Sequence, residues 1–135
     1  MSDPIEKPAH YNTTSLQPIE VIEEFRLGFH LGNAIKYLAR AGLKGDYAED
    51  LGKARWYLKR RISFGVAEGN YAPQVDMAWR VARALETWKP RRYAGVAIAS
   101  ILAASCVVDL ATFLKILENA IEAIDADLKD HGAGN

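Results

Sequence analysis

The segment from Leu31 to Arg40 restricts the fold of this chain more than any other stretch. Four residues with hydrogen-bonding or cationic side chains stand at positions i, i+3, i+4 and i+7: Asn33, Lys36, Tyr37 and Arg40. In a helix this spacing puts them on one narrow face. The opposite face then carries the apolar residues Leu31, Ile35 and Leu38. The segment therefore predicts a short helix with a polar front and an apolar back that packs on a core.

The rest of the chain predicts further helices, separated by glycine, proline and aspartate residues. We expect them over about residues 18–27, 46–62, 73–89 and 110–131, in addition to 31–41. The stretch 93–106 contains β-branched residues that suit buried strands, but its many alanines favour a sixth helix. The predicted fold is all-α, with about six helices. An N-terminal helical hairpin carries a polar groove, and a C-terminal helical scaffold supports it.

A second polar face is predicted on the helix of residues 46–62. Asp50, Lys53 and Tyr57 stand at i, i+3 and i+7, beside the apolar stripe of that helix and not within it. If this helix pairs with that of residues 31–41, the two polar faces border one groove, with Lys44 at its mouth. Cations, an amide and phenols suit a phosphate-bearing ligand with a base or sugar attached. The alternative is a solvated helix surface, with i,i+4 pairs such as Glu49 with Lys53.

Composition and charge restrict the class of protein. The chain has 135 residues, half of them hydrophobic, which is enough for one ordinary core. Its formal net charge of zero argues against general nucleic-acid binding and is compatible with self-association. Residues 1–65 carry 10 Lys and Arg against 8 Asp and Glu (+2), whereas 66–135 carry 7 against 9 (−2). We expect the first part to carry the specific binding residues and the second to serve packing and oligomerisation.

Two candidate interfaces for a homo-oligomer lie in the second part. One is the small-residue helix around Gly95, Ala99 and Ala103, and the other is the apolar stripe from Leu110 to Leu128. The sixteen uncharged residues between Arg92 and Asp109 are fewer than the roughly 20 that span a bilayer, so no membrane partner is expected. A single cysteine and the lack of a basic-then-apolar leader predict a cytoplasmic protein.

Other motifs allow competing interpretations. Glu20-x-x-Glu23 and Asp46-x-x-Glu49 could form paired acidic motifs, as all-α Mg²⁺-dependent nucleotide pyrophosphohydrolases use them. Five cations between residues 53 and 61 could form a nucleic-acid patch, although a solvated helix explains them better. His30 is expected to be a turn or capping residue. The chain has no G-x-x-x-x-G-K-[ST] motif, so it is not a standard P-loop enzyme.

Several of these motifs, taken together, resemble a known family. They are His10-Tyr11, PIEVI at 18–22, LGFHLGNAIKYLAR at 27–40, Lys44-Gly45 and EDLGKARWYL at 49–58. The pattern is similar to the small phage domain called SaV-like, over about residues 7–62. That family includes a deoxynucleotide kinase without a Walker motif. The resemblance marks as functional His10, Tyr11, Asn33, Lys36, Tyr37, Arg40, Lys44, Glu49, Asp50, Lys53 and Tyr57.

The resemblance implies a phage-type nucleotide kinase that transfers a phosphoryl group from ATP or another nucleoside triphosphate to a deoxynucleoside monophosphate. Catalytic roles are expected for Lys36, Arg40, Asp50 and His10. Substrate-binding roles are expected for Tyr11, Asn33, Tyr37, Lys44, Glu49, Lys53 and Tyr57. Mg²⁺ is a candidate cofactor, and a phage enzyme would act in the bacterial host cytoplasm. The alternatives are a non-catalytic protein that binds or sequesters nucleotides, and the pyrophosphohydrolase.

Overall fold

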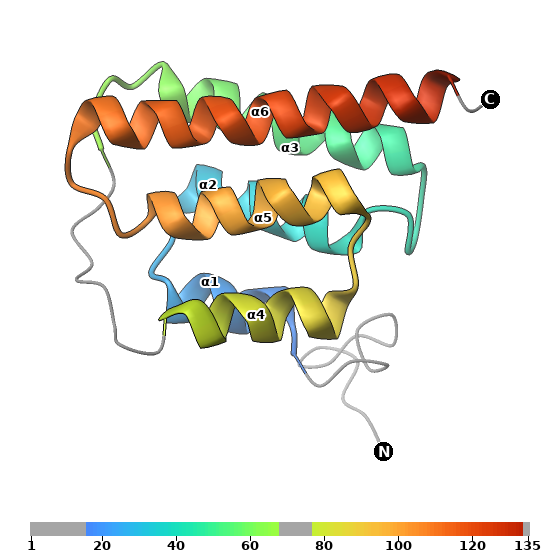
Figure 1. Cartoon of the computed structure of the whole chain (residues 1–135), viewed down its shortest axis with the longest axis horizontal. Helices are drawn as coiled ribbons and strands as arrows, with labels where there is room; N and C mark the ends of the chain where they lie inside the picture. Colours follow the sequence, from blue (N-terminus) through green and yellow to red (C-terminus); the bar gives the residue numbers. More distant parts are fainter. Residues whose placement is uncertain (1–15, 68–76, 134–135) are drawn as a thin grey trace.

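The computed structural model describes residues 16–67 and 77–133, and all structural statements below refer to these residues. They form six α-helices and no strand, which confirms the predicted all-α fold (Figure 1). The helices are Pro18–Glu24 (α1), Phe29–Arg40 (α2), Tyr47–Ile62 (α3), Met77–Trp88 (α4), Arg92–Ala104 (α5) and Leu110–Ala133 (α6).

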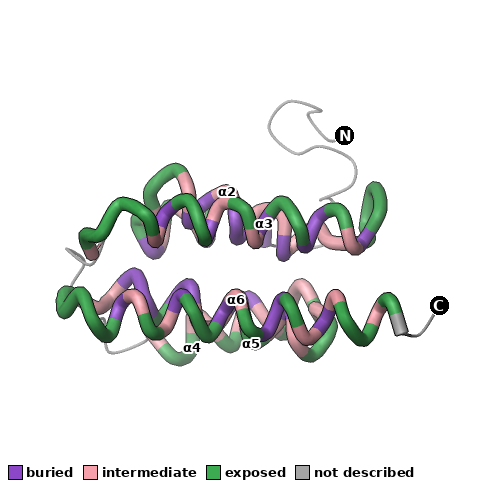
Figure 2. The backbone as a smooth tube through the Cα atoms, turned by 90° about the horizontal axis from the view of Figure 1, so that it is seen from above, coloured by how far each residue is buried: buried purple, intermediate pink, exposed green. Residues whose placement is uncertain are grey.

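The six helices pack as two layers of three. Helices α1, α2 and α3 lie side by side in the first layer, and α4, α5 and α6 in the second. Across the layers α2 packs against α5 and α3 against α6. Figure 2 shows the buried residues between the layers and the exposed ones on the outer surfaces. One hydrophobic core therefore contains residues of both layers, and the division expected at residue 65 falls in the connection between them.

Helix boundaries differ from the predicted ones where the backbone conformation changes. Helix α1 ends at Glu24 and not near residue 27, because Arg26 adopts a left-handed conformation with a φ of 54°. Helix α2 begins at Phe29 with Gly28 as its N-cap, so His30 lies within the helix. Helix α6 continues through Gly132 to Ala133. The early start of α2 matters most, because it adds two aromatic side chains to the first layer.

The apolar faces predicted from periodicity form the core. On α2, the side chains of Leu31, Ile35 and Leu38 are at most 1% exposed. On α6, Phe113, Leu117 and Ile124 are fully buried, where α6 contacts α5 and α3. Most of the stripe expected to serve as an oligomer interface therefore packs within the chain.

The outer helices of the two layers are joined by polar contacts. Glu24 of α1 accepts hydrogen bonds from Arg80 at 2.6 Å and Arg83 at 3.2 Å, both on α4. The indole N–H of Trp88 donates to the carbonyl of Leu16 at 2.9 Å. These contacts hold α4 against the start of the first layer. None of the described helices combines the length and apolar character that crossing a membrane requires.

Candidate functional site

Tyr37 and Tyr57 meet between α2 and α3, where the sequence predicted an open groove. Their ring centroids are 6.0 Å apart and the rings are inclined by only 14°, so they stack. Each ring comes from the polar face predicted for its helix. The hairpin therefore forms as expected, but the two stacked rings fill its groove.

Three cations from two helices surround the Tyr37 ring. Lys36 Nζ lies 5.1 Å from the ring centroid, Arg40 Cζ 5.3 Å and Lys53 Nζ 5.4 Å. Each cation is attracted to the ring by the ring quadrupole. The three positive charges nevertheless repel one another, so an anion bound among them would lower the energy of the cluster.

Asp50 is buried beneath this cluster, which the sequence did not predict. It was expected on a polar surface, but only 3% of it is exposed. Its Oδ1 lies 3.8 Å from Nε of Arg40, an ion pair too long for a hydrogen bond. Its Oδ2 and the Arg40 Nε are both buried without a hydrogen-bond partner in the described part of the chain. Buried polar atoms rarely lack a hydrogen-bond partner, so these two atoms can bind a water, an ion or a ligand.

Lys53 and Glu49 form the ordinary helix pair that the sequence allowed. Glu49 Oε1 lies 3.1 Å from Lys53 Nζ, and both side chains are exposed. The hydrogen bond to Glu49, followed by the charge of that carboxylate, raises the pKa of Lys53. Lys53 therefore stays protonated beside Tyr37, while Glu49 is engaged in holding it.

The other predicted site residues lie at the margins or outside the described residues. Asn33 donates from Nδ2 to the carbonyl of Phe29 at 2.8 Å. With Lys36 it borders a hollow of about 230 Å³ between α1 and α2. Lys44 is exposed in the loop between α2 and α3. His10 and Tyr11 lie outside the described residues.

Further aromatic rings extend the site beyond the predicted residues. Phe29 and His30 lie beside Tyr57, at 5.9 and 6.1 Å between centroids, and Phe64 lies 4.8 Å from His30. Our expectation that His30 is only a turn or capping residue was wrong. A sequence signal existed, because rings stand seven residues apart in two segments: His30 and Tyr37 on α2, and Tyr57 on α3 with Phe64 just beyond its end.

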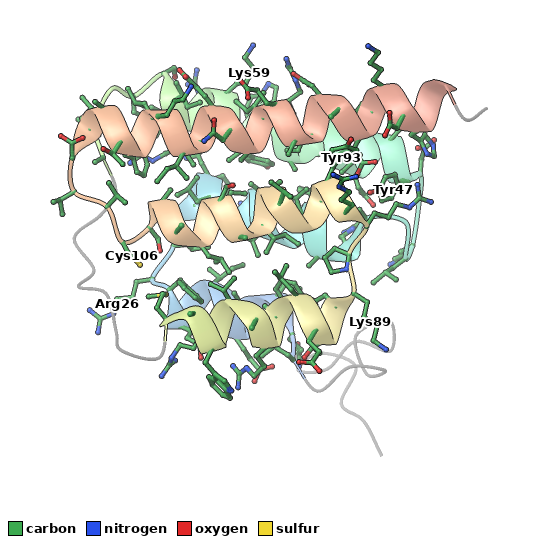
Figure 3. All side chains as sticks on the ribbon, viewed as in Figure 1. Arg26, Tyr47, Lys59, Lys89, Tyr93 and Cys106 are labelled. Atoms are coloured by element: carbon green, nitrogen blue, oxygen red, sulfur yellow. The ribbon has the colours of Figure 1, made fainter. Side chains whose placement is uncertain are left out.

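We expected the cations of α3 to form one solvated surface, but some of them make contacts within the chain. Arg55 Nε donates to Asp125 of α6 at 2.6 Å. Arg61 is only 6% exposed, and its Nη1 donates to the carbonyl of Val66 at 2.9 Å. Lys59 and Arg60 are exposed, and Figure 3 shows Lys59 on the upper side of the molecule. Two of the five cations thus serve packing between or within the layers.

The acidic motifs are used locally. Glu20 Oε2 accepts the backbone N–H of Gln17 at the start of α1, and Asp46 accepts that of Glu49 at the start of α3. The described residues contain no group of three or more His, Cys, Asp or Glu side chains that could hold a metal ion. Glu20 and Asp46 therefore act at the starts of their helices in this structure.

A separate cavity of about 410 Å³ lies at the end of the molecule where α3 and α5 begin. Tyr47, Lys89 and Arg91 line it, and Figure 3 shows Tyr47 and Lys89 at this end. The Tyr47 hydroxyl donates to the carboxylate of Asp127, and Arg91 lies 4.2 Å from the ring. Tyr47 and Asp127 are buried and join α3 to α6, so we assign this cluster to stability.

Comparison with known proteins identifies a similar family. The model of a family described as a protein of unknown function (DUF3310) matches residues 5–59. The matched segment is similar to that family and contains α1, α2, most of α3 and every site residue from Asn33 to Tyr57. Neither the curated proteins nor the solved structures include a match to the chain. The similarity thus falls on the first layer and carries no assigned activity.

Proposed function

We propose that the outer face of α2 and α3 binds nucleotides and transfers a phosphoryl group from a nucleoside triphosphate to a deoxynucleoside monophosphate. One observation carries this proposal: Lys36, Arg40 and Lys53 converge on one ring, beside a buried carboxylate with a free oxygen. Fixed cations of this kind stabilise the charge on phosphoryl oxygens in the transition state.

The local charge supports an anionic ligand. Lys36, Arg40 and Lys53 supply three positive charges against two negative charges from Glu49 and Asp50. Lys36 has no carboxylate partner in the described part of the chain and is therefore available to a phosphate. Arg40 can present its remaining guanidinium N–H groups to a second phosphate oxygen.

The reaction needs charge neutralisation more than proton transfer. The bond between the γ-phosphorus and the β–γ bridging oxygen of the donor breaks, and a new P–O bond forms from a phosphate oxygen of the acceptor. That oxygen is already anionic near neutral pH, so no general base is required. The three cations would reduce the repulsion between donor and acceptor phosphates, and Asp50 would orient the Arg40 guanidinium.

Asp50 also suits Mg²⁺ as a cofactor. Its free Oδ2 can supply one carboxylate oxygen. Mg²⁺ keeps several waters and commonly takes one or two carboxylates together with substrate phosphates. When bound, the ion would neutralise phosphate charge. Glu49 is less suited to this role, because its Oε1 already holds Lys53.

The cytoplasmic location and the self-association belong to the same proposal. Nucleoside triphosphates and deoxynucleoside monophosphates are intracellular compounds, so a kinase for them would act there. The site lies on an outer face with few enclosing walls, and a second copy could cover it.

The test is a reaction of the purified chain with ATP and each of the four deoxynucleoside monophosphates, with and without Mg²⁺, followed by chromatography. We expect a deoxynucleoside diphosphate and an equal amount of ADP. Lys36→Ala should lower turnover by about tenfold or more, because it removes a charge-assisted phosphate contact. The matched control is Lys115→Ala, an exposed lysine on α6, which should leave turnover unchanged.

Other outcomes would contradict the kinase. Nucleotide retained through gel filtration without any turnover would identify a non-catalytic binding protein. Conversion of a triphosphate to monophosphate and pyrophosphate would identify a pyrophosphohydrolase. Intact turnover in Lys36→Ala would show that the reaction takes place elsewhere.

A further inference from the structure

The imidazole of His30 is enclosed by three aromatic rings. Phe29, Phe64 and Tyr57 lie 5.3, 4.8 and 6.1 Å from it between centroids, with interplanar angles of 82°, 89° and 64°. Such edge-to-face contacts are favourable for aromatic pairs and restrict the orientation of the enclosed ring. His30 is thus held more firmly than a histidine on an open helix surface.

The ring nitrogens of His30 are not used within the described part of the chain. Neither nitrogen takes part in a hydrogen bond there, and the side chain is half-buried. A neutral imidazole offers one donor and one acceptor. A fixed ring with an unused donor and acceptor is suited to recognise a partner with complementary polar edges.

The loop after α3 supports this arrangement. Arg61 donates to the carbonyl of Val66, and its guanidinium lies 5.3 Å from the Phe64 ring. Gly65 has a φ of 70°, a left-handed conformation that glycine adopts without strain. Phe64 stands two residues after the end of α3, and the turn at Gly65 places the Val66 carbonyl where it accepts from Arg61, beside the Phe64 ring.

The site has two chemically different ends, joined by Tyr57. The three cations lie around Tyr37 at one end, and the rings of His30 and Phe64 lie at the other. Tyr57 lies 6.0 Å from Tyr37 and 6.1 Å from His30. A nucleotide has the same polarity, with an anionic phosphate and an aromatic base joined by a sugar.

We propose that the rings around His30 bind the base of the nucleotide and that His30 recognises the edge of this base through hydrogen bonds. The inference rests on the proposed nucleotide binding and adds the part of the ligand that sets selectivity. Phe29 and Phe64 are 70% and 47% exposed, which leaves ring surface free for stacking. The ligand class is a nucleoside phosphate, in preference to inorganic phosphate or a sugar phosphate.

Histidine ring resonances of the full chain test this directly by NMR. The chain has three histidines, and the variants His30→Phe and His131→Phe assign the signals of two of them. The probes are each deoxynucleoside monophosphate, deoxyribose 5-phosphate and inorganic phosphate. We expect the nucleotides to shift the His30 ring signals and leave those of His131 in place. Deoxyribose 5-phosphate should shift the Lys36 amide without moving the His30 ring.

Calorimetric affinities give a second, independent readout. His30→Phe keeps an aromatic ring but removes both hydrogen-bonding groups, and should weaken nucleotide binding by about 3- to 10-fold. Binding of deoxyribose 5-phosphate should be unchanged. His30→Gln, which keeps a donor and an acceptor, should recover part of the loss. The matched control is His131→Phe, whose ring lies 5.5 Å from Tyr47 at the other end of the molecule.

The outcomes separate this inference from the proposed kinase. A His30 ring that stays unshifted while the Lys36 amide responds to nucleotides would overturn base recognition. An equal loss of affinity for nucleotide and sugar phosphate in His30→Phe would also overturn it. A response of His30 without any turnover would support the base site and contradict the kinase. No response at either end to any nucleotide would overturn both.

Discussion

Each of the two layers contains three helices that follow one another in the chain, but the layers differ in surface chemistry. Helix α3 carries five Lys and Arg against two Asp and Glu, whereas α6 carries two against five. The two helices pack together, and Arg55 pairs with Asp125 between them. Rings and converging cations occupy the outer face of α2 and α3. The exposed apolar residues of α5, α6 and their connection are aliphatic: Val96, Val108 and Leu110.

This difference separates specific chemistry from structural support. The first layer contains features that serve more than packing. Tyr37 stacks on Tyr57, His30 contacts Phe64, and buried Asp50 has an oxygen without a hydrogen-bond partner among the described residues. In the second, Phe113, Leu117 and Ile124 complete the core. The proposed binding site on α2 and α3 depends on the second layer for support, because the apolar back of α2 would otherwise face water.

The largest effect is expected from a substitution in the core of the second layer. Phe113→Ala should destabilise the chain by about 3–5 kcal/mol, because it leaves a cavity at a fully buried phenyl ring. The loss should reach the first layer, because the Arg61 guanidinium lies 5.1 Å from this ring. Urea unfolding followed by circular dichroism and by tryptophan fluorescence should give one common transition.

Two controls sharpen that experiment. Val108→Ala, at a side chain that is 75% exposed, should change the free energy of unfolding by less than about 0.5 kcal/mol. Two separate transitions in Phe113→Ala would show that the first layer is stable without the second, which contradicts a shared core.

A smaller effect is expected at the hydrogen bond between Tyr47 and Asp127, which joins the two layers. Tyr47→Phe removes the hydroxyl that donates to buried Asp127, and should cost about 1–3 kcal/mol near neutral pH. Burial, and then the hydrogen bond to Asp127, raise the pKa of Tyr47 far above its ordinary value. The folded state therefore keeps the phenolic proton when the unfolded state loses it above about pH 10.

This linkage predicts the sign of the pH dependence. The contribution of Tyr47 is fully present below about pH 10 and decreases as the pH rises above that value. The difference in stability between the native chain and Tyr47→Phe should therefore stay constant from pH 8 to about pH 10 and shrink at higher pH. Tyr93→Phe on α5 is the matched control, and a difference for Tyr47→Phe that stays constant at higher pH as well would contradict the linkage.

The smallest effect is expected at the N-terminal caps of the two long helices, α3 and α6. Asp109 accepts from the amide and hydroxyl of Thr112 at 2.9 and 2.7 Å before α6, whereas Asp46 accepts from the Glu49 amide at 3.2 Å before α3. Asp109→Ala should therefore lower the melting temperature more than Asp46→Ala, and both less than Tyr47→Phe. Equal losses would show that the second hydrogen bond at Asp109 adds nothing.

The same cap predicts an acid-dependent change. The hydroxyl of Thr112, followed by its amide, lowers the pKa of Asp109. The stabilisation is therefore present above about pH 4, the ordinary range of aspartate, and is lost as the pH falls through the lowered value. The melting temperatures of the native chain and Asp109→Ala should converge in acid, as measured by circular dichroism.

Much of the fold could be predicted because its signals are local. The apolar residues of α2 and α6 repeat at helical spacing, and the core contains them as expected. Helix ends were predicted less accurately. The left-handed Arg26 ends α1 earlier than predicted, and Gly28 caps α2 so that this helix starts earlier than predicted. At the site, periodicity placed Lys36, Tyr37 and Arg40 together, but it left His30 out.

The sequence by itself determined which faces of the helices are apolar and which carry cations and phenols, because helical periodicity depends only on neighbouring residues. Only the tertiary structure decided that Tyr37 stacks on Tyr57, that Asp50 is buried beside Arg40, and that Phe64 closes on His30. These relations depend on how closely two helices approach and how a loop returns to them. The packing of the whole chain sets those distances, and no local pattern encodes them.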